Sequence, residues 1–139
     1  MRGPAAVKVY AEIERVKARL NAVYQEALIK FAEDMQRPVS QGGNMPVKTE
    51  FLRSSLEASP MGASPPLVPH PGGKQYHYNA DEVNSVLRTA TIRKHRLRLT
   101  YTAEYAAHAE HNHRFRALAV QNWSKHVAAA STKYAAGRL

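Results

Sequence analysis

The chain has 139 residues, of which 44% are hydrophobic and 22% charged, with 20 Lys and Arg against 11 Asp and Glu. It contains no cysteine, which excludes a disulfide framework, a thiolate metal site and a cysteine nucleophile. No apolar run approaches the roughly 18 residues of a membrane span, and the beginning of the sequence lacks the apolar stretch of a secretory signal. We therefore expect a small, soluble, basic protein made inside the cell, with residues 1–139 forming a single domain.

The first segment has the periodicity of one long amphipathic helix over about residues 7–36. Its apolar residues recur at alternating steps of three and four, which places them on one face. They are Val9, Ile13, Val16, Leu20, Val23, Ala27 and Phe31. Such a helix is longer than a domain of this size needs. Either the whole face packs in the core, or one end of it contacts a neighbouring subunit.

Short elements follow a loop that is rich in Gly, Pro and Ser. Thr49 is an expected N-cap for one or two helical turns that bury Leu52 and Leu56. Residues 54–59 then pass into a short strand.

A long arm is expected over about residues 59–75, because five prolines and three glycines interrupt any periodicity between residues 59 and 73. It contains Leu67 and Val68. The arm either docks on a partner through these residues or is disordered.

The second half of the chain combines a short helix, a strand and a final helix. Asn79 or Asp81 is expected to cap a helix that ends near Leu87, and residues 97–101 alternate as in a strand with one buried face. Residues 101–110 are expected to form a turn. A C-terminal helix over about residues 114–135 presents Phe115, Leu118, Ala119, Trp123, Val127 and Ala130 on one face. The predicted fold class is therefore α+β: a long N-terminal helix, a small antiparallel β-sheet and a C-terminal helix.

Few residues are spaced for catalysis. His108, His111 and His113 lie close together, but their spacing matches no zinc pattern and favours surface or turn histidines. Glu104 and Glu110 have no fixed geometry, and the paired glycines lack a phosphate-binding pattern. We expect no enzyme activity, no cofactor and no metal.

Positive charge is concentrated in the second half, where residues 81–139 hold ten cations and four acids. In a strand, Lys94, Arg96 and Arg98 project from the face opposite Leu97 and Leu99. This basic stripe has two interpretations. It contacts DNA phosphates or an acidic protein surface, or it is a solvated strand face without a partner. The sequence contains no base-reading module, so any contact with DNA is to its backbone.

Two segments resemble signatures of one family. Pro46–Leu56 resembles Pro-Val-x-Thr-Gly-x-Leu-Arg-x-Ser-hydrophobic, with Glu50 in place of the usual Gly. Tyr101–Glu110 resembles a later signature in which Tyr-Ala precedes an acid after a strand. Both are similar to the neck, or tail-completion, proteins of long-tailed bacteriophages, in which a C-terminal helix with an aromatic residue follows, as Phe115, Arg116 and Trp123 do here. Glu50 predicts a plain helix start instead of the family's tight turn.

The resemblance implies a structural virion protein that forms a ring, commonly of six subunits, at the head–tail junction. The expected partners are further copies of the chain, head-completion or connector proteins, and the tail tube or tail terminator protein, with DNA backbone in the channel as a further contact and no membrane. The expected locations are the virion neck and, during assembly, the host cytoplasm. We assign the subunit interface to Val9, Ile13, Leu67, Val68, Tyr105 and Glu110, and the DNA or acidic-partner contact to Lys94, Arg96 and Arg98. The alternative function is a basic, sequence-nonspecific DNA-binding accessory protein.

Overall fold

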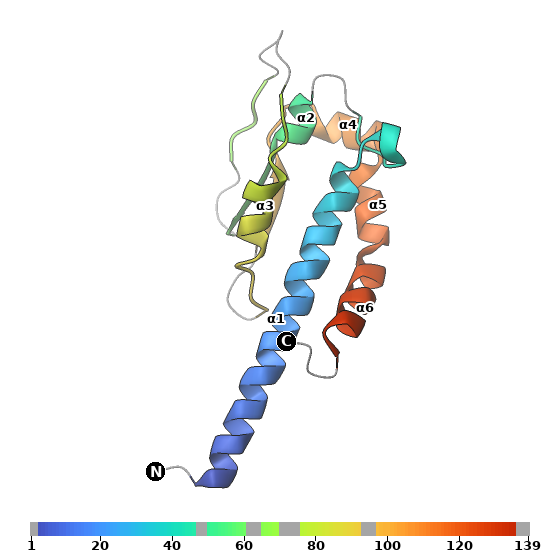
Figure 1. The fold of residues 1–139 in the computed structure, drawn as a ribbon. Helices are drawn as coiled ribbons and strands as arrows, with labels where there is room; N and C mark the ends of the chain where they lie inside the picture. The colour runs from blue at the N-terminus through green and yellow to red at the C-terminus, as the bar shows by residue number, and fades with distance from the viewer. Residues whose placement is uncertain (1–2, 47–49, 61–64, 70–75, 93–96, 136–139) are drawn as a thin grey trace.

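One long helix organises the fold, and the other elements pack along its C-terminal half (Figure 1). This computed structural model describes residues 3–46, 50–60, 65–69, 76–92 and 97–135. The elements in chain order are α1 (Pro4–Gln36), η1 (Val39–Gln41), α2 (Phe51–Ser54), β1 (Leu56–Pro60), α3 (Ala80–Leu87), β2 (Leu97–Tyr101), α4 (Ala106–His113), α5 (Phe115–Gln121) and α6 (Trp123–Lys133). The predicted α+β class, with its long first helix and small antiparallel sheet, is confirmed.

Proline marks both ends of α1. Pro4 occupies the first helical position, where a missing N–H costs nothing, and Pro38 follows the C-cap residue Arg37, whose backbone is extended. Towards its C-terminal end, α1 packs against α5 and α6, and also against α3. In Figure 1 the sheet and α3 lie on one side of α1, and α5 and α6 lie on the other.

The sheet has two antiparallel strands, with Leu56 opposite Tyr101 and Pro60 opposite Leu97. Leu97, Leu99 and Tyr101 pack against the main core cluster, as their alternation predicts. All five residues of β2 are half-buried, however, so the expected division into a buried face and a solvated face is too sharp. A sheet of two strands is narrow, so the elements packed on it cover each face of β2 only in part.

The apolar core has two clusters. The main cluster lies between α1, α3, the sheet and α5, and contains Ala32, Met35, Leu56, Val83, Leu87 and Ala119. The second lies at the end where α1 stops, and contains Met45, Phe51, Leu52, Ala103, Ala109 and Phe115. The predicted burial of Leu52 and Leu56 is confirmed.

The start of α2 differs from both predictions made for it. Glu50 is the N-cap residue, and the expected cap, Thr49, lies outside the described residues. Glu50 has a φ of 65°, in the left-handed region that glycine favours. The expectation of a plain helix start is therefore wrong, because the backbone at Glu50 turns through the left-handed region.

The C-terminal region contains three helices where one was predicted. Residues 106–113, expected within and after a turn, form α4. The single helix predicted over residues 114–135 is divided into α5 and α6, with Asn122 between them. Asn79 caps α3 by accepting a hydrogen bond from the Glu82 N–H, as one of the two expected caps.

Candidate assembly surface

The apolar face of α1 is covered along only half of its length. Val9, Ile13, Val16 and Leu20 are 58%, 45%, 42% and 48% exposed, whereas Ala27, further along the same face, is fully buried. This N-terminal half of α1 extends beyond the other elements (Figure 1). We call Val9, Ile13, Val16 and Leu20 the α1 stripe. The two alternatives for the helix thus apply to different halves of it: one half packs in the core, and the other is open to contact.

Charged side chains border the α1 stripe without covering it. Glu12 pairs with Arg15 at 3.1 Å and Glu14 pairs with Lys17 at 3.3 Å. All four side chains are largely exposed, and such pairs each contribute only about 0.3–0.5 kcal/mol. They support the helix, and they leave the apolar side chains of the stripe in contact with water.

A second open apolar region lies between β2 and α5. Two hollows of about 790 and 350 Å³ adjoin here, because Leu99, Arg116 and Val120 line both. Their other lining residues include Tyr101, Ala106, Ala117, Leu97, Phe31 and Trp123. Val120 projects from α5 with 59% of its surface exposed. We call this region the β2–α5 groove.

The two segments that resemble family signatures meet in space. The Thr102 N–H donates a 3.1 Å hydrogen bond to the Ser55 carbonyl oxygen, next to the pairing of Leu56 with Tyr101. The rings of Phe51 and Tyr105 lie 6.3 Å apart between centroids. Sequence order alone does not predict this contact. The hydrogen bond and the ring contact join the two segments into one structural unit.

Glu110, predicted at a subunit interface, binds within its own chain. Its carboxylate accepts hydrogen bonds from the backbone N–H groups of Arg116 at 2.6 Å and Ala117 at 3.3 Å. These N–H groups lie in the first turn of α5 and have no partner within the helix. The acid of the second signature therefore caps α5 and holds α4 against it. Tyr105, also predicted at the interface, is exposed at the start of α4, and partial burial raises the pKa of its hydroxyl.

The described part of the arm contacts its own chain. The Val68 N–H donates to the Thr102 carbonyl oxygen at 2.7 Å, and the Glu104 N–H donates to the Val68 carbonyl oxygen at 2.8 Å. Leu67 and Val68 remain exposed beside the second signature. Residues 61–64 and 70–75 of the arm lie outside the described residues.

Of the predicted basic stripe, only Arg98 is among the described residues; Lys94 and Arg96 lie outside them. Arg98 lies on β2 opposite Ser59 of β1, and it is half-buried. The projection of the three cations from one face therefore stays a prediction.

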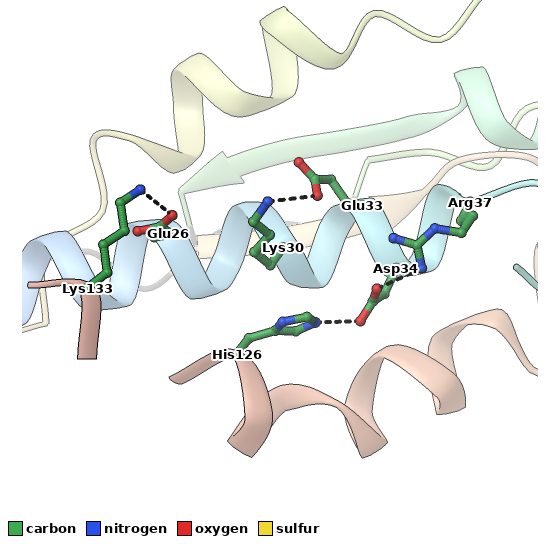
Figure 2. Close-up of polar contacts among 7 residues, drawn as sticks. All are labelled: Glu26, Lys30, Glu33, Asp34, Arg37, His126 and Lys133. Carbon is green, nitrogen blue, oxygen red and sulfur yellow. Dashed lines mark hydrogen bonds and ion pairs between the residues drawn. The ribbon is translucent and has the colours of Figure 1, made fainter. Parts of the chain in front are cut away.

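A buried polar cluster that the sequence analysis missed joins α1 to α6 (Figure 2). The Asp34 carboxylate binds the His126 Nε2 at 2.5 Å, the Asn122 amide at 3.2 Å and the Arg37 guanidinium at 3.1 Å. Burial raises the pKa of Asp34, but these partners outweigh it, and the pKa lies below its ordinary value. The one signal in the sequence was that Asp34 lies on the apolar face of the first helix, where an acid needs a partner. Its partner is 92 residues away, which no local pattern reveals.

A second missed network fixes the end of α1. The Gln36 amide donates to the Arg53 carbonyl oxygen at 2.7 Å, and the Arg53 Nε donates to the Gln36 carbonyl oxygen at 2.8 Å. The Tyr101 hydroxyl donates to Gln36 Oε1 at 2.7 Å, and burial raises the pKa of Tyr101 well above its ordinary value. These bonds orient the two signature segments relative to α1.

Neither a metal site nor a membrane helix is found in the described part of the chain. His108, His111 and His113 are exposed on or beside α4, and no three His, Asp or Glu side chains among the described residues converge to hold an ion. None of the helices in this part combines the length and apolarity that a bilayer crossing requires.

No protein-family model, curated protein or solved structure matches this chain.

Proposed function

We propose that this protein is a structural subunit that joins neighbouring copies of itself into a ring at the head–tail junction of a long-tailed bacteriophage. The observation that carries the proposal is the α1 stripe. The apolar face of α1 continues unchanged from its buried half into its exposed half. Such a face indicates that the whole helix packs against protein. Among the described residues, only part of that packing comes from its own chain.

The arrangement of the two signature segments supports the family part of the proposal. They resemble neck and tail-completion proteins separately, and in the fold they pair through β1 and β2 at the end of α1. The left-handed backbone at Glu50 matches the tight turn for which the family uses glycine. A long helix before the first signature and helices after the second complete the order that the resemblance implies.

A ring is the assembly that this role requires, since DNA passes from head to tail through a channel. In a closed ring every subunit presents two different faces to its neighbours. The partners are then the connector or head-completion proteins on one side and the tail tube or terminator protein on the other. The net charge of +9 suits DNA backbone in the channel or an acidic neighbouring ring.

Assembly in infected cells tests this function. Particles made without this chain should accumulate as separate heads and tails, and supplying the wild-type chain should join them. A variant with Ile13→Asp and Val16→Asp should fail to join them, while Ala11→Asp, on the opposite helix face, should succeed. Normal joining without the chain would overturn the proposal. A soluble monomer that binds duplex DNA of any sequence, with an affinity that falls steeply between about 50 and 200 mM salt, would favour the alternative of a DNA-binding accessory protein.

A further inference from the structure

We propose that the α1 stripe of one subunit lies in the β2–α5 groove of the next subunit. This inference rests on the proposed ring and names the surfaces that form it. Both surfaces expose apolar side chains in the described part of the chain. The inference gives each subunit one donor surface, on α1, and one acceptor surface, between β2 and α5.

The two surfaces cannot meet within one chain. Phe31 of α1 lines the groove, and Ile13 of the stripe lies 18 residues before it on the same continuous helix. At 1.5 Å per residue, these positions are about 27 Å apart along a rigid rod. The stripe therefore reaches a groove only on another copy. A donor and an acceptor at different places on one chain make a head-to-tail contact, which propagates and closes into a ring when the rotation permits.

The lengths of the two surfaces agree. Val9 to Leu20 covers about 16 Å of helix axis. The five residues of β2 cover about 14 Å at the spacing of an antiparallel strand. One helical ridge of three turns thus matches the length of the groove wall, with an apolar side chain at each turn.

The chemistry of the two surfaces is also complementary. The groove is lined by apolar side chains from β2, α1, α4 and α5, and also by polar ones that include Glu110, His111, Arg114 and Arg116. Both arginines are exposed, and within the described residues neither forms an ion pair. Glu12 borders the stripe, and when the stripe docks it exchanges an exposed partner, Arg15, for Arg114 or Arg116 of the groove. Apolar burial supplies the attraction, and the charges select the orientation.

The alternative covering of the stripe packs two α1 stripes on each other about a two-fold axis. That contact uses one surface twice, stops at a dimer and leaves the groove empty. Substitutions in the groove separate the two arrangements.

Thiol linking tests the head-to-tail contact directly, because the natural chain has no cysteine. A full-length variant with Ile13→Cys and Val120→Cys, treated with a short bismaleimide linker, should give a ladder of dimer, trimer and larger species. The two single variants, mixed, should give dimers only, and each alone should give none. The control pair is Ala11→Cys with Ala129→Cys, which lie on exposed surfaces outside the stripe and groove. A yield no higher than that of the control pair, or dimers from Ile13→Cys alone, would overturn the inference.

Mixing of blocked subunits gives a second readout that needs no linker. Ile13→Asp removes the donor and Val120→Asp removes the acceptor, and both positions are exposed, so each variant should fold. Each alone should be monomeric, and an equal mixture should form a one-to-one dimer. If Val120→Asp assembles like the wild type, the groove is not the acceptor although the ring proposal stands. If the wild type assembles neither alone nor in particles, the proposed function itself fails.

Discussion

Glu50 is a residue in a conformation that its side chain disfavours. Its φ of 65° costs a residue with a Cβ about 1–2 kcal/mol relative to the right-handed region, a cost that glycine does not carry. The side chain recovers a little of this through Arg53, 3.1 Å away, in a pair whose members are each about one-quarter exposed. The first signature segment therefore contains a glutamate, Glu50, at a backbone conformation that glycine would adopt at lower cost.

Replacing Glu50 should separate the strain from the ion pair. Glu50→Ala keeps the strain and loses the pair, and it should lower the free energy of unfolding by about 0.5 kcal/mol. Glu50→Gly loses both, and should be about 1 kcal/mol more stable than the alanine variant. Urea unfolding measures the difference. A glycine variant no more stable than the alanine variant would show that the backbone at this position is not strained.

Asp34 links the stability of the subunit to pH. Burial alone would raise the pKa of its carboxyl, but hydrogen bonds from His126, Asn122 and Arg37 hold the pKa below 3.8, its ordinary value. The ionised form is thus favoured more in the folded state than in the unfolded state. The resulting stability is present above about pH 3.8 and is lost as the pH falls through the lower folded pKa.

Asp34→Asn should remove this dependence. At neutral pH the variant should be less stable by about 1–3 kcal/mol, since His126 and Arg37 lose a charged acceptor. The difference from wild type should shrink as the pH falls below about 4. Unfolding followed from pH 7 to pH 2 tests this, with Glu33→Gln, in an exposed pair with Lys30, as the control. A difference that stays constant with pH would contradict the assigned role of Asp34.

At the scale of elements, α1 combines two kinds of helix. Its C-terminal half is stabilised by packing against α5 and α6, whereas residues 4–20 depend mainly on local propensity and exposed i,i+3 pairs. Most helical stability in proteins comes from tertiary packing of an amphipathic face, which residues 4–20 lack within the described chain. We therefore infer that the free N-terminal half frays and that docking on a neighbour stabilises it.

Amide hydrogen exchange should resolve the two halves. In a subunit blocked by Val120→Asp, residues 8–20 should exchange much faster than residues 27–36, because fraying opens only the unpacked half. In the wild-type assembly, protection of residues 8–20 should rise towards that of the packed half. Equal protection in both states would mean that the α1 stripe is not covered on assembly.

The sequence predicted helices and strands well where a single hydrophobic periodicity continued over many residues. The long helix, the strand at residues 97–101 and the cap at Asn79 were confirmed because their signals lie within a few residues. The helix α4 was missed because its sequence, rich in Ala and His, has no apolar stripe to distinguish it from a turn. Its position depends instead on Glu110, which joins it to the next helix.

The surfaces were harder to predict than the elements. Periodicity showed that the first helix has one apolar face, but not where its own chain stops covering it. That boundary depends on where α6 ends against α1, near the ion pair of Lys133 with Glu26 (Figure 2). The β2–α5 groove is a product of packing between distant segments, so no run of residues indicates it. The role of Glu110 as a cap was hidden for the same reason.

At the scale of the whole molecule, these features fit the proposed subunit, in which neighbouring copies would cover the α1 stripe. Two open apolar surfaces lie on one chain, at places that cannot contact each other within it. The signature segments, the polar cluster at Asp34 and the cap at Glu110 fix the body that carries them. The net charge of +9 is compatible with DNA or an acidic ring as a further partner. Such contacts weaken as the salt concentration increases.

The most direct test of the central claim is the mass of the full-length chain in solution, measured by sedimentation over a concentration series. The wild type should approach one closed multiple of 15.5 kDa as its concentration rises. Ile13→Asp with Val16→Asp should remain at the mass of one subunit, and Ala11→Asp should behave as the wild type. A wild type that stays at one subunit at every concentration, or a double variant that assembles equally well, would contradict the account.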